Sequence, residues 1–148
     1  MNPDVLTVPP DLRVALERIS DGLAAMGSGD PLPYAALWAQ GPDVTLFGAW
    51  GPIERGHADV TRTFEWVGSR FSGGPMVPRH DVVHACDDLA VTVGFEQGDV
   101  RVDGGELQTM TIRVTHVLRR IDGEWQLVHR HADFPPPDQR RPAQRPQA

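Results

Sequence analysis

The sequence predicts an α+β protein in which helices pack on one face of an antiparallel sheet. Amphipathic helical segments lie before residue 71, with apolar side chains three or four positions apart. From residue 79 onward, apolar and polar side chains alternate instead, and turn signals separate the alternating segments. The 148 residues, 40% apolar and 23% charged, suffice for one domain with its own core. We expect this domain at residues 11–134, after an N-terminal extension (1–10) and before a disordered tail rich in proline and arginine (135–148).

The first helix is expected from Asp11 to Met26. Asp11 is a plausible N-cap because it follows two prolines, and Gly27 and Gly29 mark the C-terminal end. The apolar residues of this segment are spaced by four, three, four and three, which places them in one stripe: Leu12, Leu16, Ile19, Leu23 and Met26.

A short second helix is expected to begin at Asp30-Pro31 and to continue to Trp38. A strand over 44–47 follows, and residues 53–55 are expected to pair back onto it after glycines break the chain. The third helix is predicted over 57–70, with an inner face made of Val60, Phe64, Val67 and Phe71.

Four strands are predicted in the second half of the chain, as a meander. They cover residues 81–85, 89–96, 108–121 and 125–133, with turns or loops at 87–88, 103–105 and 122–123. Asp122-Gly123 is the strongest hairpin signal, because these residues tolerate the positive φ angles of a two-residue turn.

The last hairpin carries the most chemically suggestive cluster in the sequence. A two-residue turn at 122–123 places His116 opposite His129, and residue 114 opposite His131. Because side chains alternate along a strand, all three histidines would share one mainly apolar face, with Arg113 and Arg130 on the opposite face. A bulge in either strand would move part of this set to the other face.

Three interpretations of the histidines remain open. In the first, the histidines are hydrogen-bonded core or interface residues. In the second, one histidine is an acid or base in a ligand pocket, since the pKa of histidine lies near working pH. The third interpretation is a three-histidine zinc site, for which the sequence offers no fourth ligand. Arg113 is an interface or surface residue, unless the pocket lies on its face and makes it an anion anchor.

Composition excludes several classes of function. A net charge of −6 argues against a nucleic-acid or anionic-membrane surface, and no apolar run is long enough to span a membrane. The chain has no lysine, so Schiff-base chemistry is excluded. Cys86 is the only cysteine and stands beside two aspartates, which disfavours a nucleophilic thiolate. We expect no secretory signal, and hence a cytoplasmic protein.

Two stretches of the chain resemble SnoaL-like proteins of the nuclear-transport-factor-2-like, or ketosteroid-isomerase-like, superfamily. One is the closing hairpin, Thr111 to Asp133, and the other is Trp38-Ala-Gln-Gly-Pro-Asp-Val-Thr-Leu-Phe47 followed by Ile53-Glu-Arg-Gly-His57. The resemblance covers about residues 12–133. It implies a cystatin-like α+β roll, in which a curved antiparallel sheet wraps around the N-terminal helices as a cone. A deep pocket and a homodimer are also implied.

Known sites of this superfamily transfer only in part. The general-base aspartate of ketosteroid isomerases falls on Phe47 or its neighbour Leu46, and their helix-one tyrosine has no counterpart, which disfavours that mechanism. In the similar hub domain of calcium/calmodulin-dependent kinases, the pocket arginines fall on Glu96, His116 and Ala132. The regular hairpin register puts residues 116 and 132 on opposite faces, so either a bulge reconciles them or one of the two alignments is wrong. Scytalone dehydratase and some polyketide cyclases resemble the remaining option, histidine and acid side chains in an apolar cone.

The first hypothesis is a cofactor-free proton-transfer enzyme, of the isomerase, dehydratase or cyclase type, acting on a hydrophobic ring-bearing metabolite. His116 would be the acid or base, oriented by Glu96 or His131. The predicted ligand-binding residues are Phe47, Trp50, Trp66, His129 and Arg113, with Trp50 as a lid because it stands on a glycine-flanked loop. The alternatives are a non-catalytic dimeric binding module of the same fold and, third, a metal-assisted hydrolase.

Overall fold

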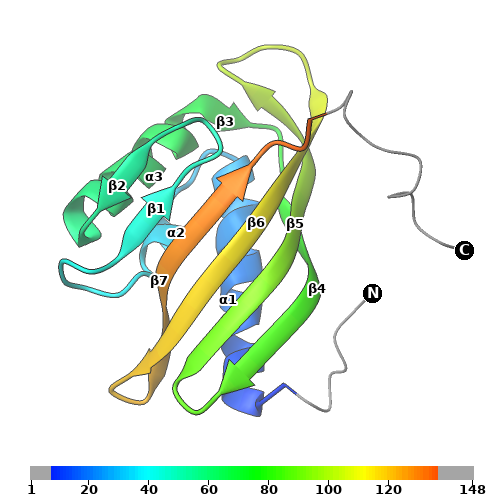
Figure 1. Cartoon of the computed structure of the whole chain (residues 1–148). Coiled ribbons are helices and arrows are strands. Elements are labelled where there is room, and N and C mark those ends of the chain that lie inside the picture. Colours follow the sequence, from blue (N-terminus) through cyan, green and yellow to red (C-terminus); the bar gives the residue numbers. More distant parts are fainter. Residues whose placement is uncertain (1–7, 137–148) are drawn as a thin grey trace, which may run out of the picture.

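The computed structural model describes residues 8–136. Within them, three helices lie on one face of a curved sheet (Figure 1). The helices are α1 (Pro10–Gly27), α2 (Leu32–Ala35) and α3 (His57–Arg70). The strands are β1 (Thr45–Phe47), β2 (Ile53–Arg55), β3 (Phe71–Ser72), β4 (Val77–Cys86), β5 (Leu89–Val102), β6 (Gln108–Ile121) and β7 (Glu124–Asp133). The predicted α+β class and its curved sheet are confirmed.

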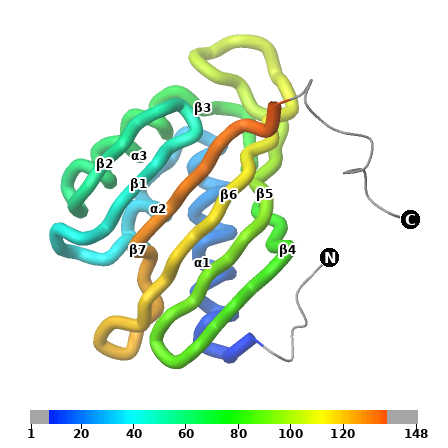
Figure 2. The backbone as a smooth tube through the Cα atoms, viewed as in Figure 1, coloured from blue at the N-terminus to red at the C-terminus, as the bar shows by residue number. Residues whose placement is uncertain are grey.

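The sheet has the strand order β2-β1-β7-β6-β5-β3, and β4 also pairs with β5. The meander from β4 to β7 is antiparallel, as predicted, whereas β1 joins β7 in parallel. Figure 2 shows β5 and β6 side by side as the long twisted centre of the sheet. The face of the sheet toward the helices is called the inner face below, and the other the outer face.

Element boundaries agree with the sequence pattern best where the pattern is long. The predicted bounds of α3 and β6 match the structure, and residues 53–55 pair back onto β1 as expected. The central strand β5 extends to Val102 rather than to residue 96, because its continuation pairs with β3 and β6 and buries Val100. The strand β4 begins at Val77 rather than at residue 81, since residues 77–80 pair with 94–97 of β5.

The first helix starts differently from the prediction. Pro9 precedes it and makes no side-chain cap, so the expected N-cap at Asp11 is wrong. The Asp11 carboxylate instead accepts a hydrogen bond from Trp125 Nε1 at 3.0 Å and pairs with Arg120 at 3.1 Å. This carboxylate therefore ties the start of α1 to the β6–β7 hairpin. The predicted apolar stripe does face the core: Leu12, Ile19, Leu23 and Met26 are buried, and Leu16 packs against them.

The β6–β7 hairpin contains a bulge that the regular register does not predict. The turn itself is as expected, with φ of 51° at Asp122 and 80° at Gly123, and pairing is regular up to Leu118 opposite Leu127. Val128 is then an extra residue, so Val117 pairs with His129 and His116 pairs with Arg130. The bulge lies where β7 changes its neighbour on the other edge, from residues 37–39 to β1.

The bulge overturns the predicted histidine cluster. His116 and Arg130 face the helices, whereas His129 and His131 pair with Val117 and Thr115 on the outer face. The expectation that three imidazoles share one face is therefore wrong, and so is the prediction that Arg130 lies on the other face of the sheet from His116. No helix of residues 8–136 is long and apolar enough to cross a membrane.

Candidate functional site

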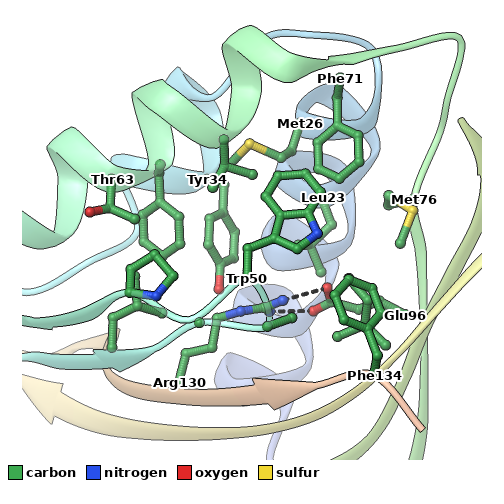
Figure 3. A pocket seen from close by; sticks show the side chains of 17 residues that line it. Leu23, Met26, Tyr34, Trp50, Thr63, Phe71, Met76, Glu96, Arg130 and Phe134 are labelled. Atoms are coloured by element: carbon green, nitrogen blue, oxygen red, sulfur yellow. Dashed lines mark hydrogen bonds and ion pairs between the residues drawn. The ribbon is translucent and has the colours of Figure 1, made fainter. Parts of the chain in front are cut away.

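A mainly apolar cavity lies between the helices and the inner face of the sheet, with about 70 Å³ of free space (Figure 3). Helix α1 contributes Leu23 and Met26, and α3 contributes Phe64 and Val67. The remaining apolar wall comes from the loops and strands around them: Leu46, Ala49, Trp50, Pro52, Phe71, Met76, Ile112 and Phe134. This space holds a few water molecules or a small organic group.

A buried ion pair forms the polar end of this cavity. Arg130 Nη1 donates to Glu96 Oε2 at 2.5 Å, and Nη2 donates to Oε1 at 2.8 Å. Both residues are less than 9% exposed and both line the cavity, as Figure 3 shows. Burial alone would lower the pKa of Arg130, but the charge of the neighbouring Glu96 carboxylate holds this pKa above its usual value. In this geometry each partner replaces hydrogen bonds to water that the other lost on burial.

Tyr34 of α2 completes the polar end. Its ring packs edge-on against Phe64 and Trp38, and its hydroxyl points toward the Arg130 guanidinium in Figure 3. Burial raises the pKa of Tyr34 above its usual value, so the phenol stays protonated and acts as a hydrogen-bond donor.

His116 lies behind these groups rather than on the cavity wall. Its Nε2 is 2.7 Å from Tyr34 Oη and 3.3 Å from Arg130 Nη1. Because a guanidinium only donates, Nε2 is the unprotonated nitrogen; it also accepts the Tyr34 hydroxyl bond, and Nδ1 carries the hydrogen. Burial and the Arg130 charge hold the pKa of His116 far below its usual range, so the ring is neutral. A separate void of about 10 Å³ borders His116 and His80.

The structure therefore rearranges the predicted catalytic set. Glu96 and His116 both face inward, but Arg130 binds both of them and Glu96 makes its short hydrogen bonds to Arg130, not to His116. His131 is exposed on the outer face, so the predicted orienting role of His131 toward His116 is wrong.

Two predicted ligand-binding residues, Phe47 and His129, lie with His131 on the outer face, away from the cavity. Phe47 is 42% exposed, and its ring meets the rings of His129 and His131 edge-on at 5.5 and 5.4 Å. His129 is half-buried and hydrogen-bonded to Thr45, and burial lowers the pKa of His129. None of these three lines the inner cavity.

Arg113, the predicted anion anchor, also lies on the outer face. It forms a bidentate pair with Asp133, with both hydrogen bonds at 2.6 Å. An open depression of about 290 Å³ surrounds this pair and His131. Its Arg113 and Asp133 are already paired with each other in solvent, so it offers a ligand less than the enclosed cavity does.

Trp50 and Trp66 meet beside the cavity. Trp50 lines the cavity and packs on Phe71 at 5.2 Å between ring centres, while Trp66 is 47% exposed and meets Trp50 edge-on. The Arg70 guanidinium lies 4.2 Å from the Trp50 ring centre and 5.0 Å from that of Trp66. Arg70 is itself held by Asp103. Trp50 is thus in the position expected of a lid residue.

Sequence reasoning missed Arg130 and Tyr34 as site residues. A regular hairpin puts Arg130 on the outer face, and only the bulge at Val128 brings it inside. One signal for the bulge was present, because the kinase-hub resemblance requires residues 116 and 132 on one face, and both are buried on the inner face. Tyr34 had no such signal, since its contact with His116 joins positions 82 residues apart.

The described residues contain no group of three histidine, cysteine or acidic side chains placed to hold a metal ion. The proposed three-histidine zinc site also fails on geometry, because β7 directs His129 and His131 away from His116. The polar groups at the end of the cavity are the carboxylate, guanidinium and phenol just described, with the neutral imidazole behind them.

The model of the SnoaL-like domain matches residues 16–137, most of the chain. The chain belongs to the SnoaL-like family. Its members are small-molecule-binding proteins, and some are isomerases or dehydratases. No protein with a curated description matches this SnoaL-like chain.

Solved structures show the same fold. A ketosteroid isomerase-like protein from Erwinia carotovora atroseptica superposes with a TM-score of 0.72 at 18% identity, over 88% of this chain and all of its own. A nuclear transport factor 2 (NTF2-like) superfamily protein from Salmonella enterica Typhimurium superposes with a TM-score of 0.65 at 23% identity, over 84% of this chain and 94% of its own. A protein of unknown function with a cystatin-like fold from Nostoc punctiforme superposes with a TM-score of 0.66 at 21% identity, over 93% of this chain and 97% of its own. Such identities establish the fold and leave the activity to the site.

Proposed function

We propose that this SnoaL-like protein binds a small, mainly apolar molecule with one polar group in the cavity and catalyses proton transfer on it. The observation that carries the proposal is the buried Glu96–Arg130 pair at the end of an apolar cavity. Apolar walls with a few placed polar groups are typical of ligand sites. The cavity is small for a ring-bearing metabolite, so such a ligand requires Trp50 to move aside.

The chemistry assigns the base to Glu96 rather than to His116. Each Glu96 oxygen accepts one bond from Arg130 and keeps a second lone pair. When Glu96 takes a proton from carbon beside a ligand carbonyl, the C–H electron pair moves into an enolate. Arg130 loses the Glu96 charge and gains the enolate charge, so the number of buried charges does not change. The Tyr34 hydroxyl, which donates to His116 Nε2 in the empty site, turns to donate a second hydrogen bond to the enolate oxygen.

His116 acts on this reaction through Tyr34. As a neutral acceptor at 2.7 Å, it fixes the direction of the Tyr34 hydroxyl in the empty site. Return of the proton from Glu96 to another carbon gives an isomerase, and expulsion of a leaving group gives a lyase. No cofactor is required for either outcome.

A non-catalytic binding module is the second candidate. It is favoured by the bidentate geometry, because each Glu96 oxygen already accepts a hydrogen bond from Arg130. In that case the pair only positions a ligand. We also propose a homodimer, as the resemblance implies, which sedimentation equilibrium tests: a single species at the mass of one chain contradicts it.

Cyclopentanone separates these functions, because it is small, mainly apolar and has exchangeable protons beside its carbonyl. With ¹³C-labelled methionine methyls, binding should shift Met26 and Met76, which line the cavity, and leave Met110 unchanged. In D₂O, the enzyme should accelerate deuterium uptake into cyclopentanone, and Glu96→Gln should abolish the acceleration. Shifts without exchange identify the binding module, and no shifts at Met26 and Met76 contradict both functions.

A further inference from the structure

We propose that the cavity selects an uncharged ligand and rejects carboxylates, because its one cation is already neutralised from within. This inference rests on the proposed function and specifies the class of its ligand.

Charge at the cavity is balanced before any ligand arrives. Of the described residues that line it, only Glu96 and Arg130 carry charge. Their bidentate pairing leaves no net charge at the polar end. Three other titratable groups lie around this end: Tyr34, a protonated phenol, His116, a neutral imidazole, and His80, whose pKa is lowered by burial. A ligand carboxylate would thus enter an apolar space without a free counter-ion.

Competition for Arg130 also disfavours an anion. To bind a ligand carboxylate, the guanidinium must leave Glu96, which would then stay buried without a partner. A buried charge without a partner is strongly unfavourable, so the exchange costs more than the new pair returns. The ligand charge would also lie close to Glu96 and be repelled by it.

An uncharged polar group meets no such barrier. A guanidinium has five N–H donors, of which Glu96 takes two bonds and His116 one, so Arg130 can donate to a neutral carbonyl while it stays paired. The Tyr34 hydroxyl supplies a further donor when it turns from His116 Nε2 to the ligand, and the second lone pairs of Glu96 accept from a ligand N–H or O–H. The site therefore matches a carbonyl, amide or hydroxyl compound.

A matched pair of probes tests this inference. Cyclopentanecarboxamide and cyclopentanecarboxylate have the same ring and nearly the same shape, and differ in charge at pH 7. In titrations followed at the Met26 and Met76 methyls, the amide should bind the wild-type protein at least tenfold more tightly. Equal binding, or tighter binding of the carboxylate, overturns the inference and leaves the proposed ligand cavity intact. If neither probe nor cyclopentanone shifts these methyls, the proposed function itself fails.

The Glu96→Gln variant provides the reverse test. Loss of the Glu96 charge frees Arg130 as a buried cation, so the preference should invert and the carboxylate should bind more tightly than the amide. Arg113→Gln is the matched control, because it removes an arginine from the outer face and should leave the wild-type preference unchanged. If Glu96→Gln does not fold, as judged by its amide spectrum, the wild-type ratio decides alone. A folded variant that still prefers the amide contradicts the charge argument.

Discussion

Glu96 and Arg130 depend on each other for their place in the protein interior. Glu96 on β5 and Arg130 on β7 meet on the inner face of the sheet. The strand β6, which carries His116, lies between β5 and β7. A single buried charge would lose its hydration without compensation, whereas the paired charges retain two short hydrogen bonds. Replacing one partner is therefore expected to be more harmful than replacing both.

Arg130→Met should lower the free energy of unfolding by about 3–5 kcal/mol, because it leaves Glu96 buried without a partner. The double variant Glu96→Met/Arg130→Met should lose less than Arg130→Met alone. Urea denaturation measures both. Arg113→Met, in the exposed Arg113–Asp133 pair between β6 and β7, is the control and should cost much less. A double variant that is less stable than Arg130→Met contradicts the mutual dependence.

His116 makes stability depend on pH. Its pKa in the folded protein lies below the unfolded value of about 6.5, so the unfolded chain binds more protons as the pH falls below that value. This contribution is complete above pH 6.5 and is lost toward lower pH, at up to about 1.4 kcal/mol per pH unit. His80 and His129, whose pKa values are also lowered by burial, act in the same direction.

The comparison of wild type with His116→Asn isolates this contribution. The difference between their free energies of unfolding should shrink as the pH falls from 7 to 5, since only the wild type loses the His116 term and the carboxylates titrate in both. Urea denaturation at several pH values gives the two curves, with His84→Asn at an exposed site as control. Parallel curves for wild type and His116→Asn would contradict a neutral buried imidazole.

At the residue scale, alternation fixes side-chain direction only where a strand is regular. On β5 it places Glu96 on one face with Ala90, Thr92 and Gly94, and this face is toward the helices, whereas on β7 the predicted directions of Arg130, His129 and His131 were wrong. The partner of Glu96 was not predictable in the same way, because it comes from β7 and depends on a bulge in that strand. Long-range partners follow from register, and one extra residue changes the register of everything after it.

At the scale of elements, the loop between β1 and β2 is the part expected to move. Trp50 stands on it between Gly48 and Gly51, half-buried against Phe71 and stacked on Arg70. Asp103, from the loop after β5, holds Arg70 in this position through hydrogen bonds of 2.9 to 3.3 Å. Arg70 thus connects the loop that covers the cavity to the end of the central strand.

Arg70→Ala should free Trp50 and Trp66 without unfolding the protein, because it removes the cation that both rings contact. Acrylamide quenching of tryptophan fluorescence should increase, while the buried Trp38 and Trp125 provide an unchanged background. Arg62→Ala is the matched control, since Arg62 is also on α3 and pairs with an aspartate but contacts no tryptophan. Equal quenching in Arg70→Ala and wild type would show that Arg70 does not restrain the loop.

The hairpin shows why elements were predictable and their junctions were not. The Asp122-Gly123 tip follows from local φ preferences, and the strands follow from alternation. The bulge at Val128 instead reflects what lies across β7, where residues 37–39 give way to β1. The segments that cause the bulge are far from Val128 in the sequence, so no local pattern around Val128 predicts it.

At the scale of the whole molecule, α1 and the sheet are joined by a close backbone approach. Gly74 N donates to Gly27 O at 3.0 Å, and a Cβ at Gly27 would lie 2.6 Å from the backbone nitrogen of Met76. Met26 and Met76, next to this contact, both line the cavity. The distance between helix and sheet at this end of the cavity is therefore set by the absence of a side chain.

Gly27→Ala should force α1 away from the start of β4 and lower the free energy of unfolding by about 1–3 kcal/mol, the usual cost of overpacking. The Met26 and Met76 methyl resonances should shift with it, because the cavity wall moves. Urea denaturation and the methyl spectrum measure the two effects. Gly105→Ala in the exposed loop before β6 is the control. Unchanged stability would mean that the helix shifts at no cost.

The mutual neutralisation of Glu96 and Arg130 also constrains how such a chain can evolve. A single substitution at either position strands a charge in the core and passes through a poorly folded intermediate, whereas a joint change avoids it. Among relatives, we expect the two positions to covary, both ionic or both neutral. A relative that keeps the arginine but has a neutral residue in place of Glu96 would be expected to bind carboxylate ligands.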